Sequence, residues 1–283
     1  EHGCIYCFAR PNHAYVDLSP GQDFEAEIFC KDNAAEVLRD TLRKPGYRCR
    51  PLVIGTATDP YQPVERERLI TREILQVLVE CRHPFSLITK SALVLRDLDL
   101  IAPMAVEGRA SVAVSVTTLD NRLKNQLEPR ASGGRERLKT VRELARAGVP
   151  VTVLVAPLIP FINDQELEDI VEQVAAAGAR SAGYVTLRLP HEVGPLWEEW
   201  LQRHYPERAE RVMSALKEMH GGASYDSRWH HRQRGQGPMA ELLARRFQVA
   251  CQRHGLAPRE SFTLDSSAFR PPGLAGQMHL WEA

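Results

Sequence analysis

The sequence lacks any apolar stretch long enough to cross a lipid bilayer, which requires about 20 consecutive apolar residues. Its longest apolar run, residues 151–162, is interrupted by Pro157 and Pro160. An excess of either charge is also absent, because 36 Lys and Arg residues balance 36 Asp and Glu residues. We therefore expect no membrane association, and any site for nucleic acid or another anion must be a local one.

Cysteine is scarce as well, and six cysteines among 283 residues exclude a small disulfide-stapled scaffold. Four of them stand alone in the sequence and are expected to be buried as small apolar side chains: Cys30, Cys49, Cys81 and Cys251. This usage fits a reducing cytoplasm. A P-loop is absent, and Gly235-Gln-Gly237 follows no expected strand and lacks a third glycine, so it is a weak signal for dinucleotide binding.

Short segments rich in β-branched residues alternate with amphipathic segments as far as residue 190. Strands are expected at residues 51–55, 85–89, 110–116, 151–155 and 184–188. Helices are expected at residues 33–44, 64–82, 135–147 and 163–177, the last with a capping box of Asn163 and Glu166, and Ser91 is expected to cap a further helix. This alternation implies a parallel sheet with functional residues at the carboxyl ends of its strands. Beyond residue 190, segments 196–219 and 238–254 are expected to be helical.

The most informative stretch is Glu1-His-Gly-Cys4-Ile-Tyr-Cys7-Phe8, whose two cysteines can reach one metal centre or each other. A zinc knuckle is one interpretation, although no second Cys or His pair follows at the usual tight spacing. A thioredoxin-like dithiol is another, although that motif belongs to a smaller fold. The third interpretation is a loop that binds an iron–sulfur cluster at the top of a barrel.

Gly-Cys4-x-x-Cys7 followed by Phe8 resembles the last two-thirds of the radical S-adenosylmethionine motif, Cys-x3-Cys-x2-Cys-aromatic. The motif's first cysteine, and the first barrel strand, would precede Glu1, so we expect a chain trimmed at its N-terminus. The resemblance implies a [4Fe–4S] cluster with Cys4 and Cys7 as two of its three thiolate ligands, and S-adenosylmethionine on the remaining iron. In this superfamily one electron from the reduced cluster cleaves S-adenosylmethionine and releases a 5′-deoxyadenosyl radical.

Residues at the ends of the expected strands resemble the spore photoproduct lyase branch of that superfamily. Thr58 and Asp59 match a Ser-Asp pair that contacts S-adenosylmethionine, and Lys90 matches a lysine that reaches the ligand's carboxylate. Ser115 matches a serine on the ligand, and Ala156 opens an apolar segment that lies beside the adenine. Each residue also has a plain structural explanation, such as an Asp-Pro turn or a hydroxyl satisfied by backbone.

The aromatic residues of the cysteine loop extend this resemblance. Tyr6 matches a position that can bond polar groups of the ligand, and Phe8 matches one that can cover the cluster or the adenine. Simple packing within the loop is the alternative for both. The resemblance implies a partial parallel (β/α)6-type barrel over residues 1–190, with a helical extension, residues 191–283, that packs on the barrel or closes it.

The resemblance also has a limit. Spore photoproduct lyases carry a cysteine directly before the Ser-Asp pair, where it returns a hydrogen atom to the product radical, and this chain has Ala57 there. Repair of thymine dimers by that route is therefore not implied. The substrate and the class of reaction, whether lyase, transferase or oxidoreductase, stay open. The implied partner is a one-electron reductant such as flavodoxin or ferredoxin.

A basic segment at residues 225–235 surrounds Trp229, on which a nucleic-acid base could stack while arginines hold phosphates. A solvated loop that closes the barrel explains the same residues. The main alternative to an enzyme is a zinc- or nucleic-acid-binding α/β protein without catalysis. A superfamily member that no longer builds a cluster is a third possibility.

Overall fold

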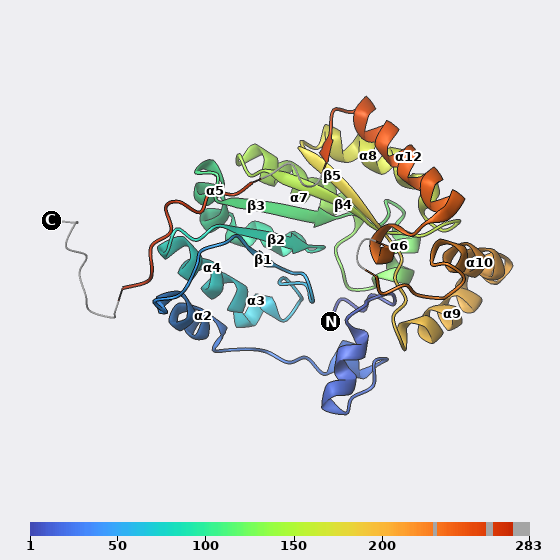
Figure 1. Ribbon diagram of the computed structural model, residues 1–283, viewed down its shortest axis with the longest axis horizontal. Helices are drawn as coiled ribbons and strands as arrows, with labels where there is room; N and C mark the ends of the chain where they lie inside the picture. The colour runs from blue at the N-terminus through green and yellow to red at the C-terminus, as the bar shows by residue number, and fades with distance from the viewer. Residues whose placement is uncertain (229–230, 259–262, 274–283) are drawn as a thin grey trace.

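The computed structural model describes residues 1–228, 231–258 and 263–273 and places six strands in one sheet (Figure 1). Every neighbouring pair is parallel, and the order along the sheet follows the order along the chain. The strands are β1 (Leu52–Ile54), β2 (Phe85–Thr89), β3 (Ala110–Ser115), β4 (Val151–Leu158), β5 (Ser181–Thr186) and β6 (Ala257–Pro258). Within the described residues β1 and β6 do not pair, so the sheet is an open barrel, which confirms the expected α/β partial barrel.

Helices fill every connection between strands and cover the outer side of the sheet (Figure 1). Before β2 the chain forms η1 (Arg10–Val16), α1 (Asp23–Ala26), α2 (Ala34–Arg43), α3 (Glu65–Arg68) and α4 (Ile70–Glu80). Between β2 and β5 it forms η2 (Ala92–Asp97), α5 (Leu98–Val106), α6 (Asn121–Leu127), α7 (Gly134–Arg146), η3 (Asp164–Glu166) and α8 (Leu167–Ala176). Between β5 and β6 lie α9 (Val193–His204), η4 (Pro206–Arg208), α10 (Ala209–Met219), α11 (His231–Arg234) and α12 (Gly237–Arg253).

The two faces of the sheet differ in the size and polarity of their side chains. Valines such as Val112 and Val153 are fully buried in the main core with leucines and isoleucines of the surrounding helices, and each such side chain stabilises the fold by roughly 1.5–3 kcal/mol. Because side chains alternate along a strand, the neighbouring Ser111 and Thr152 face the barrel interior. Ser111 donates to Ser86 across 3.0 Å. The interior therefore carries small polar side chains.

Two expected helices are each divided in two. The helix predicted at residues 64–82 breaks at Leu69, whose left-handed φ of 57° separates α3 from α4. The helix predicted at residues 196–219 breaks at Tyr205 because Pro206 follows, and a residue before proline is disfavoured in helical conformation. Ser91 does cap its segment, by accepting a bond from the backbone N–H of Leu93 at 3.2 Å.

The C-terminal segment contributes to the two larger hydrophobic cores among the described residues. Its strand β6, which the sequence analysis did not expect, pairs with β5, and α12 packs on the main core beside α8. Helices α9 and α10 form a second core with the cysteine loop, in which Trp197 is fully buried. The boundary at residue 190 stays a prediction. No helix in the described ranges is both long and apolar enough to cross a membrane.

Candidate functional site

A cavity opens at the carboxyl ends of β1, β2 and β3, where the N-terminal loop crosses the barrel mouth (Figure 1). Its lining brings together residues that lie up to 114 positions apart in the sequence, from Glu1 to Ser115. Most of the predicted site residues are among them: Cys4, Tyr6, Cys7, Phe8, Thr58, Asp59, Lys90 and Ser115. Ala57 also lines the cavity, whereas Ala156 does not. The structure thus assembles these side chains in one place, and their roles stay predictions.

A buried arginine holds the backbone of the cysteine loop in place. Arg10, only 1% exposed, donates from Nε and Nη2 to the backbone oxygen of Cys4 at 3.1 and 2.9 Å. Its Nη2 also pairs with Glu25 at 2.6 Å, and its guanidinium lies 5.1 Å from the ring centre of Phe24. Sequence analysis missed Arg10, because nothing in the local pattern distinguishes it from a surface arginine.

The two thiols of the loop are protected from solvent. Burial raises the pKa of Cys4 to about 12, and burial also raises the pKa of Cys7. A thiolate here is costly unless a positive charge compensates it, because desolvation disfavours the charged form. A bound metal centre would supply that charge and make thiolates of both residues.

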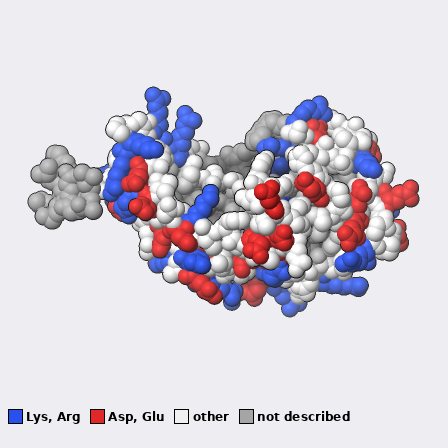
Figure 2. All heavy atoms as spheres, turned by 90° about the horizontal axis from the view of Figure 1, so that it is seen from below, with Lys and Arg blue, Asp and Glu red and all other residues white. Residues whose placement is uncertain are grey.

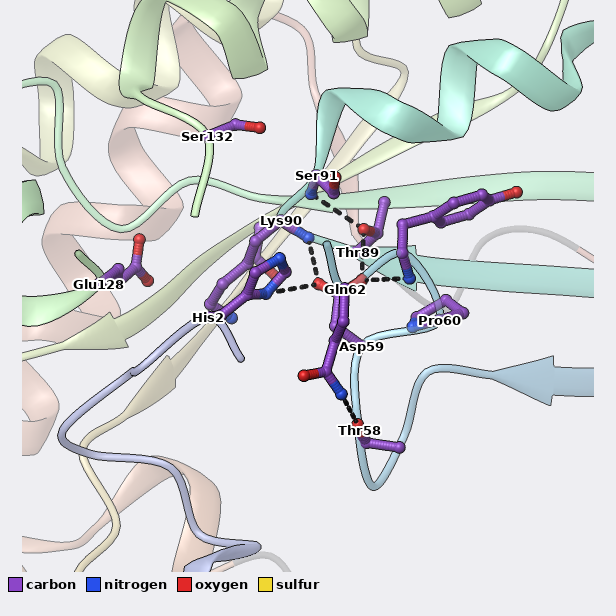
Figure 3. Close-up of polar contacts among 12 residues, drawn as sticks. His2, Thr58, Asp59, Pro60, Gln62, Thr89, Lys90, Ser91, Glu128 and Ser132 are labelled. Atoms are coloured by element: carbon purple, nitrogen blue, oxygen red, sulfur yellow. Dashed lines mark hydrogen bonds and ion pairs between the residues drawn. The ribbon is translucent and has the colours of Figure 1, made fainter. Parts of the chain in front are cut away.

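Asp59 joins the end of β1 to the end of β2 (Figure 3). Its carboxylate accepts bonds from the backbone N–H of Tyr61 at 2.9 Å, from the hydroxyl of Thr89 at 2.7 Å and from the backbone N–H of Lys90 at 2.7 Å. His2 Nδ1 lies 3.6 Å from the same carboxylate. Burial lowers the pKa of His2 although Asp59 opposes this, so the imidazole is neutral at pH 7.

The remaining polar residues of the cavity lining differ in whether they form hydrogen bonds or ion pairs within the protein. The hydroxyl of Thr58 accepts a bond from Gln62 at 2.7 Å (Figure 3). Lys90 directs its ammonium toward the face of Tyr6, 6.0 Å from the ring centre, and no hydrogen bond or ion pair to its Nζ occurs within the described residues. Ser115 is 4% exposed. Lys90 thus offers an unpaired positive charge to the cavity.

A buried ion pair supports the loop from the side of β3. Glu128 and Arg137 are both almost fully buried and form a salt bridge, and Tyr6 donates its hydroxyl to Glu128. Thr117 donates to the same carboxylate at 2.6 Å. Burial by itself would raise the pKa of Glu128, but the Arg137 and Lys90 cations and the two hydroxyl donors outweigh it and lower the pKa to about 2.

This pair was missed by sequence analysis, in which both residues are ordinary charged positions. Arg137 also donates to the backbone oxygen of Ser115 at 3.0 Å. Through Glu128 it therefore connects the end of β3 to the hydroxyl of Tyr6. The hydroxyl of Tyr6 donates to Glu128, and the predicted contact of Tyr6 with polar groups of a ligand stays a prediction.

The loop after β4 is held by Asn163. Its side-chain nitrogen donates to the backbone oxygens of Thr117 at 2.8 Å and of Pro157 at 2.9 Å, and its oxygen accepts from Ile159 at 2.7 Å. The predicted capping box at Asn163 is therefore wrong, because this side chain bonds to the loop and not to the helix start. Ala156 precedes a cis peptide bond and accepts from the hydroxyl of Thr117 at 2.9 Å.

Gly55, directly after β1, permits the close approach of β2. Its φ is +98°, and a Cβ atom there would lie 2.2 Å from the backbone oxygen of Ile88.

Gly55→Ala is expected to lower the free energy of unfolding by about 3 kcal/mol, because strain and a backbone clash add together. Gly108→Ala, where φ is +72° but nothing lies within 4 Å, is expected to cost about 1 kcal/mol. Equal losses in urea titrations of both variants would contradict this account.

The basic segment lies partly outside the described residues, which include neither Trp229 nor residue 230. Arg228 is neutralised by Asp226 at 2.7 Å. Helix α11 packs on β5, where the hydroxyl of Thr186 donates to the backbone oxygen of Gln233 at 3.1 Å. The guanidinium of Arg234 lies 4.1 Å from the ring centre of Tyr184. The segment therefore adjoins the barrel, and its predicted role with nucleic acid stays a prediction.

A comparison with known protein families finds a match, and it covers the cysteine loop and strands β1 to β4. Residues 1–174 match the model of the radical SAM superfamily. The chain belongs to this superfamily. An uncharacterized protein of Mycobacterium tuberculosis is 38% identical to it over 213 residues, which are 75% of this chain and 63% of that protein. The chain thus spans less than two thirds of the length of that relative.

Solved structures share the architecture. Spore photoproduct lyase complexed with dinucleoside spore photoproduct superposes with a TM-score of 0.60 at 14% identity, covering 90% of this chain and 72% of that one. SuiB of Streptococcus suis bound to S-adenosylmethionine superposes with a TM-score of 0.53 at 10% identity, covering 91% and 47%. At such identities the likeness shows the fold, and it confirms that this radical SAM protein has an open barrel like that of spore photoproduct lyase.

Proposed function

We propose that this radical SAM protein binds a [4Fe–4S] cluster and S-adenosylmethionine in the cavity at the barrel mouth and uses them to start radical chemistry on a substrate. One observation carries the proposal. Cys4 and Cys7 share a single cavity with Asp59, Lys90 and Ser115, which stand at the carboxyl ends of three parallel strands. This is the edge at which α/β barrels place their reacting groups.

The residues present fit the two cofactors. Cys4 and Cys7 are thiol donors whose pKa values are raised by burial, and the positive charge of a cluster would stabilise both as thiolates. They would supply two of the three thiolates that hold the cluster of this superfamily. The unpaired ammonium of Lys90 suits the carboxylate of S-adenosylmethionine, and the buried Ser115 lies in the same lining. A contact between Ala156 and the adenine would require the ligand to extend from the cavity toward β4.

When bound, the reduced cluster supplies the electron that cleaves S-adenosylmethionine into methionine and a 5′-deoxyadenosyl radical. The protein's residues position the reactants. Arg10 fixes the backbone of Cys4, Glu128 fixes Tyr6, and Asp59 fixes the backbone of Lys90. Phe8, 41% exposed, covers the outer side of the loop and limits access of water to the reacting atoms.

The substrate is a separate part of the proposal. Nucleic acid is one candidate, because a solved structure with this fold holds a dinucleoside photoproduct. Ala57 occupies the cavity position where a hydrogen-donating cysteine stands in spore photoproduct lyases, so we do not extend the proposal to thymine-dimer repair. A flavodoxin or ferredoxin would supply the electron. The free cysteines of the chain fit the reducing cytoplasm.

Anaerobic reconstitution tests the proposal. The protein, with any natural residues that precede Glu1, is incubated with iron and sulfide, reduced with dithionite and given S-adenosylmethionine. We expect iron, acid-labile sulfide and 5′-deoxyadenosine in the product mixture. Bound zinc in place of iron would support a non-catalytic zinc protein instead and would overturn the proposal.

A further inference from the structure

Arg188 stands just after β5, on the side of the barrel mouth away from the strands that line the cavity. Its guanidinium carbon lies 4.6 Å from the ring centre of Phe8, so the guanidinium stacks on an aromatic residue of the cysteine loop. Phe8 itself lines the cavity with Cys4 and Cys7. Stacking occupies the flat face of a guanidinium and leaves its outer edge, where the two terminal Nη groups carry N–H donors, available.

No acidic group neutralises Arg188. Its Nε is buried without a hydrogen-bond partner, and neither an ion pair nor a hydrogen bond of its other nitrogens occurs in the described part of the chain. Four other arginines with little exposed surface are each paired with a carboxylate: Arg10 with Glu25, Arg72 with Asp97, Arg137 with Glu128, and Arg246 with Glu168. An unpaired, half-buried guanidinium is unfavourable by itself and favours an anion from solution.

We propose that Arg188 binds an anionic group, a carboxylate or a phosphate, of the molecule on which the radical acts. The proposal rests on the radical chemistry proposed above and adds the chemical class of the substrate. A planar guanidinium stacked on Phe8 can hold either anion through two parallel N–H donors. It would then hold the substrate beside the loop that carries Cys4 and Cys7.

This site is distinct from the one expected for S-adenosylmethionine. Lys90 follows β2 and Arg188 follows β5, so three strand spacings, about 14 Å along the sheet, separate the strand ends. Lys90 faces Tyr6 and Arg188 faces Phe8, so the two cations contact different residues of the cysteine loop. One cation would serve the cofactor's carboxylate and the other the substrate's anion.

The one face that Figure 2 shows gives no support to a long polyanion as the ligand. Basic and acidic side chains are interspersed over the face shown in Figure 2. A groove that tracks a nucleic-acid backbone would require a continuous basic path. Arg228 directly precedes Trp229 in the sequence, and its guanidinium is already paired with the carboxylate of Asp226.

Nuclear magnetic resonance of arginine side chains tests the inference. The Nε–Hε signal of Arg188 is assigned by its loss in Arg188→Gln and followed while inorganic phosphate or acetate is added to the reconstituted protein. We expect a saturable shift of this signal, and the stronger of the two anions identifies the preferred group. Arg188→Lys keeps the positive charge but loses the two parallel N–H donors of the guanidinium. This variant should bind the preferred anion about tenfold more weakly than the wild type. The shifts of neighbouring backbone amide signals measure its affinity.

Arg228→Gln is the matched control, because it removes an arginine that is already paired, and it should leave the Arg188 titration unchanged. An Arg188 signal that responds to neither anion, or that responds only to S-adenosylmethionine, overturns the inference. Iron and sulfide are measured on the same samples. A protein without a cluster whose Arg188 still binds the anion would refute the radical proposal alone, whereas a protein with a cluster but a silent Arg188 would refute only this inference.

Discussion

Cys7→Ala is expected to lower the iron retained after reconstitution by about 100-fold or more and to abolish formation of 5′-deoxyadenosine. The cluster of this superfamily is held by three thiolates, and the loss of one leaves a second iron without a protein ligand. Cys7 is half-buried, and Cys4 is the only other thiol of the described residues that lines the cavity, so no further cysteine is placed to replace it. Iron content, the visible absorption of the cluster and product chromatography measure the effect.

Cys30→Ala is the matched control. Cys30 is a free, half-buried thiol that does not line the cavity, so its removal should leave iron binding and product formation at the wild-type level. Retention of a full cluster by Cys7→Ala would show that this thiolate is not a ligand. Equal loss of iron in both variants would point to general thiol damage and would contradict the assignment to the loop.

Arg137→Met is expected to lower the free energy of unfolding by about 3–5 kcal/mol, because it leaves Glu128 as an uncompensated buried charge. Both side chains of the pair are at most 1% exposed, so water cannot replace the lost partner. The change also removes the bond to the backbone of Ser115, at the end of β3. Urea titration followed by circular dichroism measures the loss.

Two further variants separate the ion pair from general damage. Arg146→Met breaks a surface pair with Glu143 and should cost less than about 1 kcal/mol. Combining Arg137→Met with Glu128→Leu removes both charges and should recover a large part of the lost stability, because no buried charge stays unpaired. If Arg137→Met were no more destabilising than Arg146→Met, the pair could not be the support of the cysteine loop.

Strand positions near the middle of the chain could be predicted closely. The strand expected at residues 85–89 is observed at Phe85–Thr89, and the one expected at 110–116 ends one residue earlier, at Ser115. Runs of buried apolar and β-branched residues carry this information locally. The strand expected at 184–188 is observed at Ser181–Thr186, because Ser181 and Gly183 do not read as strand formers even though their neighbours in β4 impose that conformation.

The supports of the site could not be predicted in this way. Arg10, Glu128 and Arg137 are charged residues in a chain where a quarter of the residues are charged, and no spacing marks them as buried. Glu128 accepts a hydrogen bond from the hydroxyl of Tyr6, which lies 122 positions away in the sequence. This bond can form only when the N-terminal loop crosses the barrel mouth. Burial and partner together convert an ordinary carboxylate into one whose pKa is about 2.

Local spacing and side-chain type were sufficient to predict the alternating α/β pattern, the cysteine pair and the polar residues near the ends of β1, β2 and β3. Tertiary structure alone decided which of those residues share a cavity, that Asp59 bonds to β2, and that Arg188 stacks on Phe8 without a counterion. The physical reason is that burial and charge pairing are properties of neighbours in space. Segments far apart in the chain become neighbours only when the sheet forms.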